Sequence, residues 1–109
     1  MPTLKDVQTE VNRQLIRDYG HLDFTSENIT NIKANVFLGL SEEAGEVAGL
    51  MKRVLRNFPR DRARITQENF IEEMGDVLWY LAACCAAQGT TLEEIWEYNV
   101  KKLTERYGE

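Results

Sequence analysis

Residues 27–56 read ENITNIKANVFLGLSEEAGEVAGLMKRVLR, and this stretch decides the fold class. Apolar residues recur in it at three- and four-residue intervals, which is the spacing of one face of an α-helix. We therefore predict a long helix from Glu27 to Arg56, capped at its start by Thr25 or Ser26. Pro59 ends it, because the residue before a proline is disfavoured in the α region. The apolar stripe comprises Ile29, Ile32, Val36, Leu40, Val47, Met51 and Leu55.

Three further helices are predicted on either side of it. They run from Leu4 to Tyr19, from after Thr66 to Gln88, and from after Thr91 to Tyr107. Gly20 and Gly89 are the expected stop residues, and Glu94, three residues after Thr91, makes a capping-box pattern. The residues expected to face the core include Phe70, Met74, Leu78, Ile95, Val100 and Leu103. Because no window alternates as a strand does and the connections are short, we predict an all-α, four-helix bundle-like fold. It forms a single domain over residues 1–109.

The composition excludes several functional classes. A net charge of −5 disfavours nucleic-acid binding, which draws on lysine- and arginine-rich surface. No apolar run approaches the roughly 20 residues that cross a bilayer, and residues 1–14 lack the apolar core of a signal peptide. Cys84 and Cys85 are adjacent, which fits neither a disulfide framework nor a zinc site. We expect a cytoplasmic protein with reduced thiols and with no nucleic-acid or membrane partner.

Two acidic pairs break the usual separation of charged and apolar helix faces. Glu43 and Glu46 are three residues apart, so they share one face of the long helix, next to Val47. Glu73 and Asp76 repeat this arrangement on the following helix. The alternative is that all four are ordinary solvent-facing helix acids. Two such pairs beside apolar residues on neighbouring helices favour a cluster of four carboxylates instead.

A cluster of this kind needs a cation. Carboxylates held close together repel one another, and removing them from water is costly. Ligand sets made only of oxygen suit Mg²⁺, Mn²⁺ or Ca²⁺ rather than zinc. Mg²⁺ usually shares its remaining positions with substrate phosphates, so it would join an acidic protein to a polyphosphate.

A second group of polar residues lies on the last helix. Asn99, Lys102 and Arg106 follow i, i+3, i+7 spacing, so they share a face that could bind phosphate. The alternative is a solvated face near a helix C-terminus, where cations are favoured. Lys52 and Arg53, just beyond the first acidic pair, could bind phosphate in a similar way.

The acidic residues also carry a family resemblance. The stretch from Ser41 to Glu46 (SEEAGE), followed by residues 72–78 (EEMGDVL), resembles the E-E-x-x-E…E-x-x-D pattern of MazG-like nucleotide pyrophosphohydrolases. Asn99-x-x-Lys102 and Arg106 resemble the phosphate-contacting segment of that family. The resemblance covers the chain from about Asn35 to Tyr107.

The resemblance implies an all-α fold related to dimeric dUTPases, with Mg²⁺ (or Mn²⁺ in its place) on four acids. Mapped onto this sequence, the metal ligands are Glu43, Glu46, Glu73 and Asp76. It also implies a homodimer or homotetramer in which helices of one subunit complete the site of another. The implied reaction converts a (deoxy)nucleoside triphosphate to a nucleoside monophosphate and pyrophosphate, in a role of nucleotide-pool house-cleaning.

Further residues are candidates for catalysis and base recognition. Glu42 and Glu72 each directly precede a proposed ligand, and either could orient the attacking water. The alternative for each is an exposed place on the helix surface. The base needs an aromatic or apolar slot, for which the candidates are Trp79, Tyr80, Trp96, Phe24 and Phe37, with His21 as a loop contact. The alternative for these aromatics is a place in the core or at a subunit interface.

Three other functions compete with this one. Di-iron carboxylate bundles use Glu-x-x-His motifs, but the only histidine, His21, does not follow a glutamate by three positions. A non-enzymatic helical oligomerisation module would show neither cation-dependent stability nor nucleotide turnover. A nucleotide-binding regulator, or a phosphohydrolase acting on another pyrophosphate compound, would keep the fold and change the role.

Overall fold

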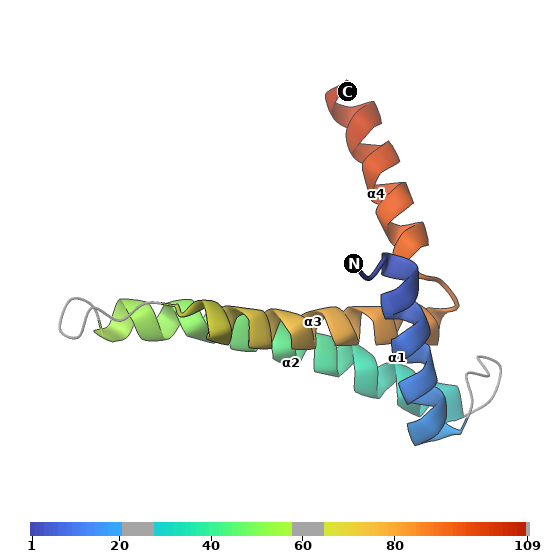
Figure 1. Ribbon diagram of the computed structural model, residues 1–109, viewed down its shortest axis with the longest axis horizontal. Coiled ribbons are helices and arrows are strands. Elements are labelled where there is room, and N and C mark those ends of the chain that lie inside the picture. The colour runs from blue at the N-terminus through green and yellow to red at the C-terminus, as the bar shows by residue number, and fades with distance from the viewer. Residues whose placement is uncertain (21–27, 58–64, 109) are drawn as a thin grey trace.

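The computed structural model describes residues 1–20, 28–57 and 65–108 and shows four helices in this part of the chain (Figure 1). These are α1 (Leu4–Tyr19), α2 (Asn28–Asn57), α3 (Gln67–Gln88) and α4 (Leu92–Tyr107). The predicted all-α class is confirmed, and α2 begins and ends one residue later than predicted. No described helix has the length and apolar character needed to span a membrane. The predicted features at His21, Phe24, Thr25, Ser26 and Pro59 lie outside the described residues.

Local capping explains where the helices begin and end. The hydroxyl of Thr66 accepts a hydrogen bond from the Asn69 amide, and that of Thr91 accepts one from the Glu94 amide, each at 3.1 Å. Thr3 caps α1 in the same way and forms a full capping box with Asp6, which the sequence analysis did not predict. Gly20 and Gly89 end α1 and α3 in the left-handed conformation, at φ 88° and 78°, as their lack of a Cβ allows.

α2 and α3 lie side by side and run antiparallel (Figure 1). The two helices approach closely at Gly39, where the Tyr80 ring occupies the space that a Cβ atom would need. One turn away, the Cys84 thiol donates to the Val36 carbonyl at 3.3 Å. A glycine on one helix and an aromatic ring on the other therefore set both the spacing and the register of this pair.

The core lies around the C-terminal half of α3, where small side chains let α1 and α2 approach closely. It consists of Val11, Leu15, Ile32, Val36, Ala82, Ala83, Cys85, Ala86, Ala87 and Leu92. Both cysteines are free thiols, as predicted, and burial raises the pKa of each. The thiols therefore act as small apolar groups in the packing.

One buried polar side chain joins three of the helices. Gln8 of α1 is only 4% exposed, and its Nε2 donates to the Ala82 carbonyl of α3 at 2.9 Å. Its Oε1 accepts from the Leu92 amide of α4, also at 2.9 Å. Because the first amides of a helix have no partner within that helix, this bond satisfies a buried donor and fixes the start of α4.

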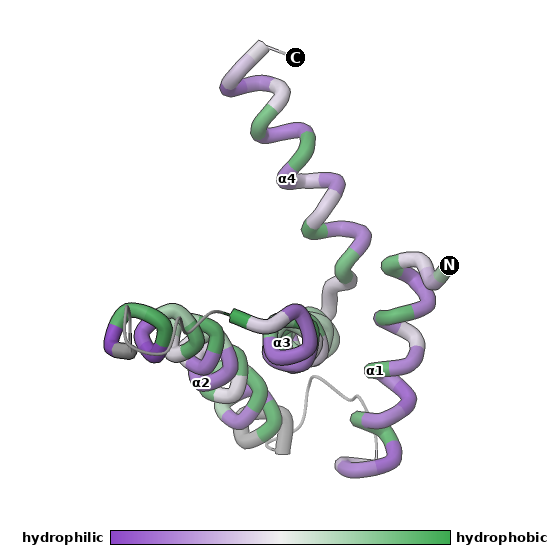
Figure 2. Tube along the Cα trace, turned by 60° about the vertical axis from the view of Figure 1, so that its left-hand side comes forward, coloured by the Kyte–Doolittle hydropathy of each residue, from purple (hydrophilic) through white to green (hydrophobic). Residues whose placement is uncertain are grey.

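Beyond its first turn, α4 extends away from the α2–α3 pair (Figure 1). Hydrophobic residues nevertheless recur along it (Figure 2). Ile95, Val100 and Leu103, which were expected to face the core, are exposed, and so are Phe70, Met74 and Leu78 on α3. Met51 and Leu55 at the end of α2 are exposed as well. The reason is that no element within the described ranges covers these faces.

We expect Gln8→Leu to lower the free energy of unfolding by about 1–3 kcal/mol, because it leaves the buried Leu92 amide without an acceptor. Urea titration at a fixed protein concentration measures this. Gln88→Leu, at an exposed position of α3, is the matched control and should change stability by less than about 0.5 kcal/mol. Equal effects of the two variants would contradict the role assigned to Gln8.

Gly39→Ala should also destabilise the fold. Replacing a helical glycine by alanine gains up to about 1 kcal/mol, but overpacking against the Tyr80 ring should cost about 1–3 kcal/mol. The control is Gly75→Ala on α3, where an added Cβ meets nothing within 4 Å, so only the stabilising gain is expected. Thermal unfolding of the two variants compares them directly, and a stabilised Gly39→Ala would rule out the close contact.

Candidate functional site

Three carboxylates from two helices meet one turn away from the Gly39–Tyr80 contact. Glu43 lies four residues after Gly39, and Asp76 lies four residues before Tyr80. Since residues four apart share a helix face, antiparallel packing places Glu43 opposite Asp76. Oxygens of Glu43, Glu73 and Asp76 lie within 4.8 Å of one another. The structure thus brings together three of the four predicted metal ligands.

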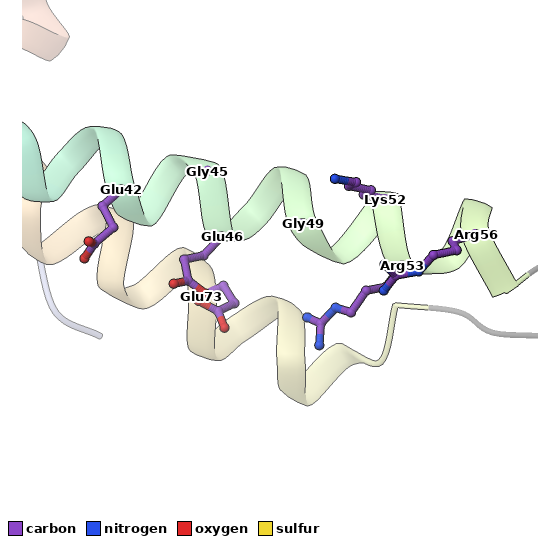
Figure 3. Close-up of a pocket in the computed structure, with 8 residues that line it drawn as sticks. All are labelled: Glu42, Gly45, Glu46, Gly49, Lys52, Arg53, Arg56 and Glu73. Atoms are coloured by element: carbon purple, nitrogen blue, oxygen red, sulfur yellow. The ribbon is translucent and has the colours of Figure 1, made fainter.

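The fourth predicted ligand, Glu46, lies next to this cluster rather than inside it. It continues the same face of α2 and lies beside Glu73 (Figure 3). Glu46 and Glu73 both line an open pocket of about 470 Å³, whose other lining residues are Glu42, Gly45, Gly49, Lys52, Arg53 and Arg56. The acids form one end of this pocket and the cations form the other. Gly49 lies between the two groups, and Gly45 lies between Glu42 and Glu46 (Figure 3).

The cluster is electrostatically unfavourable when it holds no cation. Partial burial raises the pKa of Glu43, and the charges of Asp76 and Glu46 raise it further. Partial burial likewise raises the pKa of Glu73, followed by the charges of Glu46 and Glu72, while Arg53 opposes the shift. Each ionised carboxylate thus makes the ionisation of its neighbours harder, which a bound cation would reverse.

The donor set fits a hard divalent cation. Oxygens that share one octahedral Mg²⁺ with bonds of about 2.1 Å lie about 3.0–4.2 Å apart, and the oxygens of the three carboxylates lie within 4.8 Å of one another, near this range. All the donor atoms are oxygens, and such a ligand set suits Mg²⁺ or Mn²⁺ better than it suits zinc. Within the described ranges, the two ion pairs present are Arg13–Glu10 and Arg17–Asp18 of α1. None of the acids in the cluster is therefore neutralised by a basic side chain there.

The two candidate catalytic acids differ in position. Glu42 lines the pocket together with Glu46 and Glu73. Glu72 is exposed on α3 and is not one of the residues that line this pocket, although its charge acts on Glu73. Glu42 is therefore closer to the space that a substrate would occupy.

The candidate base-binding aromatics are spread over two helices. Tyr80 lies beside the acids, and burial raises the pKa of its hydroxyl, followed by the charges of Glu43 and Glu42. Trp79 packs edge-on against Tyr80, with ring centroids 5.1 Å apart, and its Nε1 donates to Gln14 at 2.7 Å. Trp96 is 57% exposed on α4 and lines a different, largely apolar pocket of about 350 Å³. Phe37 is exposed on α2.

The predicted phosphate-binding residues lie on α4 and not beside the acids of the same chain. Asn99 and Lys102 line a pocket of about 440 Å³ that includes none of the four predicted metal ligands. Arg106 is exposed in the last turn of α4. A single chain therefore does not bring these residues to the carboxylate cluster.

Arg56, Gly45 and Gly49 were not singled out from the sequence as pocket residues, and Lys52 and Arg53 were considered only briefly. A signal was present, because these positions share one helix face with Glu42 and Glu46. What could not be read from the sequence was that α3 leaves this face open.

A family model described as the MazG nucleotide pyrophosphohydrolase domain matches residues 33–109. The chain is 39% identical over 74 residues to "Gene 37 protein" of Mycobacterium phage L5, a match that covers 65% of this chain and 62% of the phage protein. It is 36% identical over 73 residues to "Uncharacterized protein YvdC" of Bacillus subtilis (strain 168), covering 62% of this chain and 69% of that protein. No solved structure matches the chain.

The raised pKa values of Glu43 and Glu73 predict an unusual pH dependence of stability. A carboxyl whose pKa is raised on folding binds its proton more tightly in the folded state. Without a divalent cation, such a carboxyl therefore makes its full contribution to folding stability when the pH is below the ordinary glutamate pKa of about 4.3. This contribution is lost as the pH rises through the raised pKa of the folded state. In EDTA, Glu73→Gln should thus be at least as stable as the wild type at pH 7.

Mg²⁺ should reverse this order, raising the Tm of the wild type at pH 7 more than that of Glu73→Gln. Differential scanning calorimetry with Mg²⁺ or EDTA measures both effects. Glu97→Gln, an exposed change on α4, should respond to Mg²⁺ as the wild type does. An equal Mg²⁺ response in Glu73→Gln would show that the cluster is not the cation site.

Proposed function

This chain belongs to the MazG nucleotide pyrophosphohydrolase domain family, and we propose that it hydrolyses (deoxy)nucleoside triphosphates to nucleoside monophosphate and pyrophosphate in the presence of Mg²⁺. The observation that carries this proposal is the meeting of Glu43, Glu73 and Asp76 between antiparallel helices. An acidic cluster of this kind can hold an anionic substrate only through a cation. House-cleaning of a cytoplasmic nucleotide pool is the role that we assign to this activity.

Glu43, Glu73 and Asp76 would hold the metal ion, with Glu46 as the fourth ligand at the edge of the pocket. When bound there, Mg²⁺ would neutralise phosphate oxygens and make the α-phosphorus more electrophilic. Mn²⁺ offers the same oxygen preference and should substitute.

Glu42 is the residue that we assign to orienting the attacking water, because it lines the pocket beside Glu46 and Glu73. The water oxygen bonds to the α-phosphorus, and the bond to the bridging oxygen breaks. That oxygen leaves with the electron pair as part of pyrophosphate, and the carboxylate accepts the proton of the water. Glu72, on the exposed side of α3, would act less directly, through its charge on Glu73.

Tyr80 is the aromatic residue best placed to contact the nucleoside, since it lies beside Glu43 and Asp76. Trp79 supports the Tyr80 ring from one side. Trp96 of α4 would reach a nucleotide only across a subunit interface.

A second subunit would complete the site. Apolar residues of α3 and α4, among them Met74, Leu78 and Leu103, are exposed in the single chain, and exposed apolar faces are typical of surfaces that bind another protein. Pairing these faces in a homodimer or homotetramer would bury them. It would also carry Asn99, Lys102 and Arg106 of one subunit toward the acids of another, where they would offset the charge of the phosphates.

The test is pyrophosphate release from a panel of standard and modified NTPs and dNTPs, with Mg²⁺ and again with EDTA. Groups that merely hydrogen-bond a metal ligand already contribute about 10–100-fold to metal affinity or activity. Glu43→Gln and Asp76→Asn should therefore reduce turnover by more than that, with unchanged far-UV circular dichroism. Glu97→Gln should retain full activity.

Near-normal turnover in both acid variants would contradict the metal assignment. A folded wild-type protein that turns over no nucleotide would favour an oligomerisation or nucleotide-binding module instead.

A further inference from the structure

The charges along the pocket face of α2 are separated by sign. Glu42 and Glu46 occupy its first part, and Lys52, Arg53 and Arg56 occupy its last part (Figure 3). Between these two parts only Gly49 lines the pocket. Helices stabilised by their surface charges place opposite signs three or four residues apart. Here the neighbours at these spacings repel, as Lys52 and Arg56 do. Helix stability therefore does not account for the arrangement.

Nor do other structural roles account for the basic residues. Lys52, Arg53 and Arg56 are exposed, and none of them takes part in either ion pair found in the described portion of the chain. The dipole at a helix C-terminus favours cations only within the last turn. That turn contains Arg56 but neither Lys52 nor Arg53.

Gly49 keeps the space between the opposite charges open. A Cβ atom added at Gly45 or Gly49 would meet nothing within 4 Å, so neither glycine is required for helix–helix packing. Both also weaken a helix relative to alanine. Gly49 leaves bare backbone along the pocket between Glu46 and Arg53, a span of seven residues, or roughly 10 Å along the helix axis. Gly45 does the same between Glu42 and Glu46.

We propose that Lys52, Arg53 and Arg56 form a subsite on α2 for the pyrophosphate end of the substrate. The proposal rests on the proposed function, and it places this subsite on the same subunit as the acids. The α-phosphate lies at the carboxylate cluster, and the β- and γ-phosphates lie over Gly49. Guanidinium groups bind phosphate oxygens through paired hydrogen bonds, and here they stabilise the charge that develops on the leaving pyrophosphate.

This arrangement fixes the direction of the substrate along α2. The pyrophosphate end points toward the C-terminus of the helix, and the nucleoside points the opposite way, toward Gly39 and Tyr80. The subsite therefore distinguishes ligands that carry a pyrophosphate group from ligands that carry a single phosphate. Inorganic pyrophosphate and triphosphates occupy it, whereas a nucleoside monophosphate does not reach it.

Isothermal titration calorimetry in Mg²⁺ with inorganic pyrophosphate, and separately with nucleoside monophosphates, tests the proposal. Arg53→Gln should weaken pyrophosphate binding about tenfold or more, as expected for the loss of a charged hydrogen bond. It should leave monophosphate binding and the Mg²⁺-induced rise in Tm unchanged. Arg17→Gln, the same substitution at an exposed position of α1, should leave all three at the wild-type value.

Gly49→Leu tests the same subsite without changing the charge. It should fill the open part of the pocket and weaken pyrophosphate binding, with unchanged Mg²⁺-induced stabilisation. Pyrophosphate affinity that is unchanged both in Gly49→Leu and in the triple variant Lys52→Gln/Arg53→Gln/Arg56→Gln would overturn the subsite, while wild-type turnover would leave the proposed function intact. A wild-type protein that neither binds nor releases pyrophosphate would overturn both proposals.

Discussion

The contact between Gly39 and the Tyr80 ring is the constraint on which the candidate site depends. Two antiparallel helices can slide past each other, and their acidic residues meet in only one register. The ring fits against α2 only where a Cβ atom is missing, so this contact selects that register. One turn farther along, Glu43 then lies opposite Asp76, and Glu46 lies beside Glu73. A packing interaction outside the carboxylate cluster thus determines which carboxylates meet.

Beyond this contact, α2 carries features that weaken it as a helix. Its pocket face has like charges at neighbouring positions and glycines at Gly45 and Gly49. The acids at the α2–α3 junction raise one another's pKa, an effect that a bound cation would reverse. Sites that bind charged ligands commonly show such local conflicts, because the ligand supplies the missing charge. The face of α2 is best explained by what it binds.

Gln8 fixes a second packing arrangement, where α3 leads into α4. By bonding to both the Ala82 carbonyl and the Leu92 amide, it fixes the point at which α4 departs from the rest of the chain. The outward course of α4 leaves its apolar residues uncovered and separates Lys102 from the carboxylate cluster. In the proposed assembly, a second subunit would cover the apolar face of α4. The same contact would bring the phosphate-binding residues of α4 to the acids of that second subunit.

The four helices, most of their caps, the two acidic pairs and the family can be predicted from the amino-acid sequence, because each of these depends on residues close together in the chain. Spacing of three or four defines a helix face, and Thr66 or Gly89 acts within one turn. The three-dimensional packing was needed to find the Gly39–Tyr80 register, the bonds of Gln8, the open pocket beside Arg53 and the exposure of Ile95 and Leu103. These features depend on which side chains from distant parts of the chain come into contact. Helical periodicity shows which face of a helix is apolar, but it does not show which residue of another helix will pack against it.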